Sequence, residues 1–171
     1  MISIITAVHN GLSFNKIYLE YLRKYTRNPY EIIIIDNAST DGSREYFEEN
    51  GCKVIANSVN YSYPYCQNQG IREAKGEYLF FLNNDIIVCP DWDIKLIEAA
   101  KQHGVDIISA AGIENLGDNQ ATKAISRAWK RVKNPLMVFG FGRRVLLLMH
   151  RLMYGNWERY CKRRFDKFAI R

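Results

Sequence analysis

Residues 77–85 are Glu77-Tyr78-Leu79-Phe80-Phe81-Leu82-Asn83-Asn84-Asp85, a short apolar run that ends in three polar side chains. An apolar run of this length, bounded by turn-forming residues, predicts a buried strand. The polar triplet then lies at the carboxyl end of the strand, which is where open α/β sheets bind their ligands. Asp85 and its neighbours offer oxygen atoms to a hard cation such as Mg²⁺ or Mn²⁺. The alternative is a plain turn, because Asn and Asp favour turns.

Two earlier apolar runs end in the same way. Ile2–Val8 predicts a first strand, and residues 31–35 predict a second strand that ends in Asp36. Helical spacing over 12–25, a short helix to about residue 50, a third strand over 52–56 and a helix over 65–74 alternate with them. Right-handed crossovers gather the carboxyl ends of parallel strands at one edge. We therefore expect Asp36 and Asp85 to share an edge of the sheet.

The alternation continues with a helix that begins at residues 91–93 and a further strand over 105–110. It predicts an α/β fold with a doubly wound, mostly parallel, Rossmann-like sheet. We place the ligand-binding domain at residues 1–115 and a basic helical segment at 116–171. The charge changes sign between these parts: residues 1–120 carry 10 Lys and Arg against 16 Asp and Glu, whereas residues 121–171 carry 14 against 2. Such an asymmetry predicts a separate role for the basic part at an anionic partner.

Several classes of protein are disfavoured by composition and motifs. The chain of 171 residues has the length of one ordinary domain, and it contains no apolar run long enough to cross a membrane. We expect no signal peptide at the first residues, and reduced structural thiols at the four dispersed cysteines. No glycine-rich dinucleotide motif, phosphate-binding P-loop or nucleophile elbow is present. A diphosphate bound at the predicted edge would therefore need a metal.

A specific resemblance follows from four stretches taken in order. Residues 2–10 resemble the opening strand of family-2 glycosyltransferases, and residues 31–43, with Ile-Asp-Asn-Ala-Ser-Thr-Asp-Gly-Ser, resemble their second strand and loop. Residues 57–60 and 68–71 match the asparagine-rich loop and the helix after it. Residues 75–85 resemble the strand that carries the Asp-x-Asp metal motif of the family, with Asn83 where an Asp is common. The resemblance covers about residues 1–110.

The resemblance implies a GT-A fold, a nucleotide-diphosphate sugar as donor, and Mn²⁺ or Mg²⁺ as cofactor. It implies that Asp36 hydrogen-bonds the base, typically uracil, and that Asp85 ligates the metal with weaker help from Asn83. The other nucleotide-binding positions that we expect are Thr6, Ala7, His9, Asn68 and Asn84. Alternatives remain at single positions: Asp36 as a helix-capping acid, Asn68 as a local hydrogen-bonding group and His9 as part of the pocket wall.

The general base of the family is an acidic residue in the acceptor half, often in a Trp-x-Glu-Asp-like segment. The nearest analogue here is Trp157-Glu158-Arg159, so Glu158 is the candidate catalytic base, although Arg159 stands where a second acid is expected. Glu114 and Asp118 are weaker candidates. The chain ends soon after this segment, which leaves open an abbreviated acceptor half or the donor-binding part of a longer protein.

The basic residues 121–153 have the pattern of amphipathic helices, with apolar and cationic side chains interleaved. This composition suits the surface of an anionic membrane, and it equally suits a helical subdomain with a solvated basic face. We expect no nucleic-acid binding, because no recognised module accompanies the charge.

Together these observations predict a metal-dependent, inverting glycosyltransferase. It would move a sugar from a nucleotide-diphosphate donor, UDP favoured, to a saccharide or lipid-linked acceptor, in the cytoplasm or at the cytoplasmic face of the membrane. Two other functions stay open: a non-catalytic or truncated domain that binds a sugar nucleotide or a membrane, and a sugar nucleotidyltransferase. The latter would need a glycine-rich basic loop after the first strand, which His9-Asn10-Gly11 does not supply.

Overall fold

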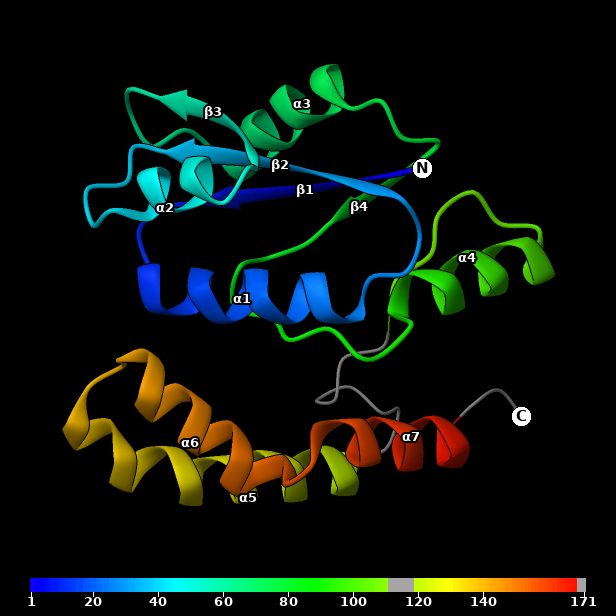
Figure 1. The fold of residues 1–171 in the computed structure, drawn as a ribbon. Coiled ribbons are helices and arrows are strands. Elements are labelled where there is room, and N and C mark those ends of the chain that lie inside the picture. Colours follow the sequence, from blue (N-terminus) through cyan, green and yellow to red (C-terminus); the bar gives the residue numbers. More distant parts are fainter. Residues whose placement is uncertain (111–118, 169–171) are drawn as a thin grey trace. The chain divides into compact units, whose positions relative to one another are not determined.

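The computed structural model describes residues 1–110 and 119–168, and it divides the chain into two compact units, Met1–Val88 and Cys89–Arg171 (Figure 1). The predicted domain boundary at residue 115 lies outside the described residues.

The first unit is built on a parallel sheet of four strands in the order β3-β2-β1-β4. The strands are β1 (Ile2–Val8), β2 (Tyr30–Asn37), β3 (Lys53–Asn57) and β4 (Tyr78–Phe81). The two central strands carry the long β-branched runs, and their side chains are buried almost throughout. This pattern is expected for parallel strands that are covered on both faces. The predicted parallel α/β fold is confirmed.

Three helices, α1 (Leu12–Tyr25), α2 (Ser43–Glu49) and α3 (Tyr63–Glu73), cover this sheet, with α1 and α3 on opposite sides (Figure 1). Successive residues of β1 face opposite helices. Ile5 joins a core cluster with Cys66 of α3, whereas Thr6 hydrogen-bonds Tyr18 of α1. Helix α3 approaches the sheet so closely that a Cβ at Gly70 would collide with Ile5 Cγ2.

The second unit contains α4 (Trp92–His103), α5 (Asn119–Leu136), a short 3₁₀ turn, η1 (Met137–Phe139), α6 (Arg143–Tyr154) and α7 (Trp157–Phe168). The predicted basic helical segment is therefore helical where it is described. The predicted strand over 105–110 is wrong: these residues form no strand, and the Ile107 side chain is 91% exposed. A β-branched run needs a neighbouring strand to bond with, and β4 pairs with β1 alone in the described part of the chain. Among the described helices, none is long and apolar enough to cross a membrane.

Candidate nucleotide and metal site

The carboxyl edge of the sheet collects the polar residues that follow the strands. The register places Val8 of β1 beside Asp36 of β2, and Asp36 beside Ala56 of β3. On the other side of β1, the backbone N–H of Leu82 donates to Ile5 O at 3.1 Å, so the chain stays against β1 just beyond β4. Asp36, at the end of β2, and Asp85, in the turn after β4, thus lie at the ends of strands that point to the same edge.

Asp36 is a buried acid with one unpartnered oxygen. The residue is 2% exposed at the end of β2. Its Oδ2 accepts a long hydrogen bond of 3.3 Å from the Ser39 backbone N–H. Its Oδ1 is buried and has no hydrogen-bond partner within the described residues. A buried polar atom left without a partner costs roughly 1–3 kcal/mol, so a donor supplied by a ligand would relieve an existing penalty.

Asn37, the next residue, organises the loop after β3. Its Nδ2 donates to Asn60 Oδ1 at 2.5 Å and to Tyr61 O at 2.8 Å, and its Oδ1 accepts from the Tyr61 N–H at 2.9 Å. The Asn37 carbonyl also lies 2.7 Å from His9 Nδ1, which anchors the exposed imidazole beside β2. Sequence reasoning missed this role; the available signal was an asparagine at the end of a strand followed by an asparagine-rich loop.

A second network joins the turn after β4 to α1 and α2. Asn15 of α1 is fully buried. Its Nδ2 donates to Ser43 Oγ at 2.8 Å and to Asn10 O at 3.2 Å, while its Oδ1 accepts from Asn84 Nδ2 at 2.7 Å. Asn84 therefore holds the turn that carries Asp85. Asn15 was also missed, because a buried polar residue inside an apolar helical pattern gives no sequence signal of its partner.

One carboxylate fixes the beginning of two helices. Asp41 Oδ2 accepts from the N–H of Leu12, the first residue of α1, at 2.8 Å. Asp41 Oδ1 accepts from the N–H and the Oγ of Ser43, the first residue of α2, at 3.1 and 2.5 Å. Partial burial raises the pKa of Asp41, but these hydrogen bonds outweigh burial and hold its pKa below the usual value. Asp41 therefore stabilises the frame of the site.

Asp85 and Asn83 are exposed on the turn after β4. No hydrogen bond or ion pair engages the Asp85 carboxylate within the described ranges 1–110 and 119–168, and no group of three His, Cys, Asp or Glu side chains there could hold a metal. One carboxylate and one amide oxygen are too few ligands to fill the coordination sphere of a metal ion. They fit a Mg²⁺ or Mn²⁺ ion that takes its remaining ligands from water and a diphosphate.

The other predicted residues lie in different environments. Thr6 is buried and its Oγ1 lies 2.6 Å from the Tyr18 hydroxyl; burial raises the pKa of Tyr18, and the bond to Thr6 offsets only part of that rise. Ala7 is half-buried in β1, and Asn68 is exposed on α3. Glu158 is exposed in the first turn of α7, in the second unit. The roles of these residues stay predictions.

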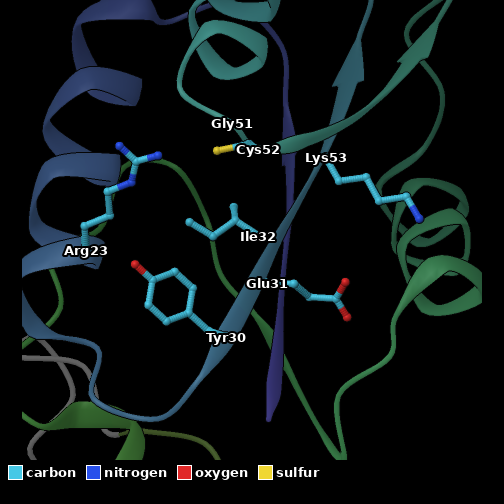
Figure 2. Close-up of a pocket in the computed structure, with 7 residues that line it drawn as sticks. All are labelled: Arg23, Tyr30, Glu31, Ile32, Gly51, Cys52 and Lys53. Atoms are coloured by element: carbon cyan, nitrogen blue, oxygen red, sulfur yellow. The ribbon is translucent and has the colours of Figure 1, made fainter.

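A hollow of about 300 Å³ lies at the opposite, amino edge of β2 and β3 (Figure 2). Its charged side chains already have partners: Arg23 bonds Asn50, Glu31 accepts from Ser3 Oγ at 2.6 Å, and Lys53 pairs with a glutamate of α3 at 2.5 Å. It lies at the starts of the strands and holds none of the predicted site residues, so it is not the candidate site. Its lining residues are Arg23, Tyr30, Glu31, Ile32, Gly51, Cys52 and Lys53.

Comparison with known proteins gives the same picture. A family described as "Glycosyl transferase family 2" matches residues 3–160. EpsH of Bacillus subtilis is 33% identical over 104 residues, which are 58% of this chain and 30% of EpsH. The glycosyltransferase GlyG of Streptococcus pneumoniae is 26% identical over 63% of this chain and 38% of its own length. A structure of S. aureus TarS 1–349 in complex with UDP superposes on 66% of this chain and 38% of that chain, with a TM-score of 0.53 and 20% identity. This likeness to TarS supports the predicted GT-A fold. The chain thus spans about a third of the length of these relatives.

Proposed function

We propose, since this chain belongs to glycosyl transferase family 2, that it binds a nucleotide-diphosphate sugar at the carboxyl edge of its sheet and serves in the transfer of that sugar. The observation that carries the proposal is the buried Oδ1 of Asp36 at that edge, which has no hydrogen-bond partner among residues 1–110 and 119–168. A ligand with an N–H group could donate a hydrogen bond to this buried acceptor oxygen.

The nucleobase is the part of the donor that suits Asp36. Uracil presents an N–H at position 3, which can donate to Oδ1 and remove the penalty of an unsatisfied buried oxygen. Cytosine has no hydrogen at position 3, so its ring nitrogen would meet the carboxylate as a second acceptor. We therefore favour UDP over CDP as the nucleotide. The relative TarS was solved in complex with UDP, which agrees with this choice.

The diphosphate belongs at the turn after β4. Asp85, with the amide oxygen of Asn83, would hold Mn²⁺ or Mg²⁺ there, and the ion would neutralise charge on the leaving diphosphate. Asn84 keeps this turn in place through its 2.7 Å hydrogen bond to Asn15. Because the protein offers one carboxylate, tight metal binding should require the nucleotide.

Transfer itself needs an acceptor and a base. In the reaction that we propose, a carboxylate takes the proton of an acceptor hydroxyl while that oxygen bonds to the anomeric carbon, and the bond to the diphosphate breaks on the opposite face. The configuration at the anomeric carbon is then inverted. Glu158 is our candidate for this base, with a saccharide or lipid-linked acceptor and action at the cytoplasmic face of a membrane.

The direct test is calorimetric titration of the chain with UDP and with CDP, each with and without Mn²⁺. We expect binding of UDP that strengthens with Mn²⁺, and weaker binding of CDP. Asp85→Ala should remove the effect of Mn²⁺. Glu77→Ala is the matched control, because Glu77 is exposed just before the start of β4, at its other end. The proposal would be overturned if neither UDP nor CDP bound. It would also be overturned if Mn²⁺ strengthened UDP binding to Asp85→Ala as much as to the wild type.

A non-catalytic sugar-nucleotide-binding domain is the second candidate function. It is favoured by Arg159, which follows Glu158 at the position where the family's base segment commonly has a second acid. Both candidates bind the nucleotide, so turnover separates them: release of UDP from UDP-sugars in the presence of saccharide and lipid-linked acceptors indicates the enzyme. Binding without release, under conditions in which the site is saturated, indicates the binding domain.

A further inference from the structure

The bend between α5 and α6 exposes a group of large apolar side chains. Met137, Val138, Phe139 and Phe141 are 42%, 85%, 73% and 44% exposed, and we call these four residues the apolar tip. They follow one another almost directly in the chain, at the end where the α5–α6 hairpin turns (Figure 1). Large apolar side chains exposed in one place indicate a surface that binds something.

Helix α5 leads to this tip with a segregated charge pattern. One side of the helix is half-buried, with apolar residues at helical spacing: Ile125, Trp129, Val132 and Leu136. The exposed side carries the cations at the same spacing: Lys123, Arg127, Lys130 and Arg131. Helix α5 contacts α6 of the same unit, and its four cations are exposed along the approach to the tip.

Cations also follow the tip, since Arg143 and Arg144 are exposed in the first turn of α6. Arg131 and Arg143 are separated by only eleven residues that contain the whole tip. The sequence from residue 119 to residue 157 contains eight Lys and Arg and no Asp or Glu. The apolar tip thus lies between two clusters of positively charged side chains. A partner that matches this surface has an apolar interior bordered by negative charges.

We propose that the apolar tip inserts into the interface of an anionic membrane, while the flanking Lys and Arg side chains contact the phosphates of the lipid headgroups. Val138 and Phe139, the most exposed of the four, would reach the acyl boundary. Long basic side chains can extend from the apolar zone to the headgroups while their stems stay buried. This attachment lies at the interface and does not cross the bilayer. It is independent of the nucleotide site, so either proposal can fail alone.

A membrane suits the tip better than water or a protein groove. A solvated basic face would not need four large apolar side chains at its end, because their exposure to water is unfavourable. Residues 119–157 contain no acid, so a protein partner would have to be acidic around the whole tip, whereas an anionic bilayer presents negative charge on every side of an inserted group. Anionic lipids attract such clusters without a defined partner geometry.

The test is flotation of the full chain, without nucleotide, on vesicles of phosphatidylcholine alone and of phosphatidylcholine mixed with phosphatidylglycerol. We expect binding to the anionic vesicles that weakens as salt is added. Arg143→Gln with Arg144→Gln should weaken it by about fivefold for each cation removed, the factor that one Lys or Arg provides near an anionic surface. Arg72→Gln with Lys75→Gln, which removes two exposed cations of the first unit, is the matched control.

The apolar contribution is tested with Val138→Asp against Val59→Asp. Both residues are exposed valines, at 85% and 52%, but Val59 lies in a loop of the first unit. Val138→Asp should abolish flotation, and Val59→Asp should leave most of it, with circular dichroism confirming that the helices persist in each variant. Equal losses in the two variants would overturn the proposal. So would equal binding to neutral vesicles, no vesicle binding, or a concentration-dependent dimer that Val138→Asp dissociates while lipids have no effect.

Discussion

Replacement of Asp36 by alanine should weaken nucleotide binding without a cost in stability. Asp36 Oδ1 is buried without a partner in the described residues, and Oδ2 accepts one long hydrogen bond of 3.3 Å from the Ser39 N–H. Removal of an unsatisfied buried oxygen recovers roughly 1–3 kcal/mol, and loss of one neutral-to-charged hydrogen bond of poor length costs about 1 kcal/mol. The free energy of unfolding of Asp36→Ala should thus stay unchanged or rise by up to about 2 kcal/mol.

The same substitution removes the acceptor for the uracil N–H. A hydrogen bond to a charged group contributes about 1.5–3 kcal/mol, which corresponds to a loss of roughly 10- to 150-fold in UDP affinity. Urea unfolding of the unliganded protein and calorimetric titration with UDP and Mn²⁺ measure the two effects separately.

Asp41→Ala is the matched comparison. Asp41 is an acid close to Asp36 in the sequence, but we expect its replacement to lower the stability of the protein. Its carboxylate caps α1 and α2 through the Leu12 and Ser43 N–H groups. A helix cap contributes about 1 kcal/mol, and Asp41 caps two helices. Because the Asp41 side chain is exposed, water weakens each bond, and we expect Asp41→Ala to be less stable than the wild type by about 1–2 kcal/mol. A loss of stability in Asp36→Ala as large as in Asp41→Ala, with UDP affinity retained, would refute the assignment of Asp36 as a ligand-binding acid.

Three further outcomes follow from single contacts. Gly70→Ala should lower the free energy of unfolding in urea by about 1–2 kcal/mol. The added Cβ would lie 2.3 Å from Ile5 Cγ2, which puts the overpacking cost in the upper part of its usual range, at about 2–3 kcal/mol, against a gain of about 1 kcal/mol in helix propensity; an equal or higher stability would contradict the close packing of α3. Cys89 and Cys161 place their Sγ atoms 3.1 Å apart, so oxidised glutathione should join them by thiol–disulfide exchange: one thiol forms a mixed disulfide with glutathione, and the second displaces glutathione to close the internal disulfide. Mass spectrometry should then show a loss of two hydrogens with no glutathione attached, whereas Cys161→Ser, which lacks the resolving thiol, should form no internal disulfide at Cys89; retention of glutathione by the wild type as readily as by Cys161→Ser would contradict the pairing. The pKa of Asp41 is lower in the folded protein than its ordinary value of 3.8, so the ionised carboxylate stabilises the fold above pH 3.8, and this stabilisation is lost as the pH falls below that value. The difference in stability between the wild type and Asp41→Asn should therefore shrink from pH 7 to pH 3. A difference that stays constant would contradict the capping role.

Much of the first unit could be predicted from short segments. The four-isoleucine run of β2 is apolar enough to be buried on both faces, and the polar residues that end each strand are turn formers. The predicted strand over 105–110 failed for a different reason. Its composition is that of a strand, but whether a β-branched run pairs depends on a neighbour that its own sequence does not contain.

The polar frame of the site shows the same limit. Asn84 and Asn15 are 69 residues apart in the sequence, and Leu12 and Asp41 are 29 apart, yet each pair is joined by a hydrogen bond. No local pattern marks an asparagine as the partner of one particular distant residue, because several nearby groups could satisfy it equally well. The choice is made when the strands align and α1 and α2 pack on the sheet.

The sequence by itself determined the class of fold, the edge of the sheet that carries Asp36 and Asp85, and the basic character of the last third, since hydrophobic period, turn chemistry and charge are properties of the residues in order. Only the tertiary structure decided that Asp36 Oδ1 finds no partner in the part of the chain that is described, that Asp41 caps two helices, and that Met137, Val138 and Phe139 remain exposed. Burial and hydrogen-bond partners depend on which distant segments come together, and that is settled by packing.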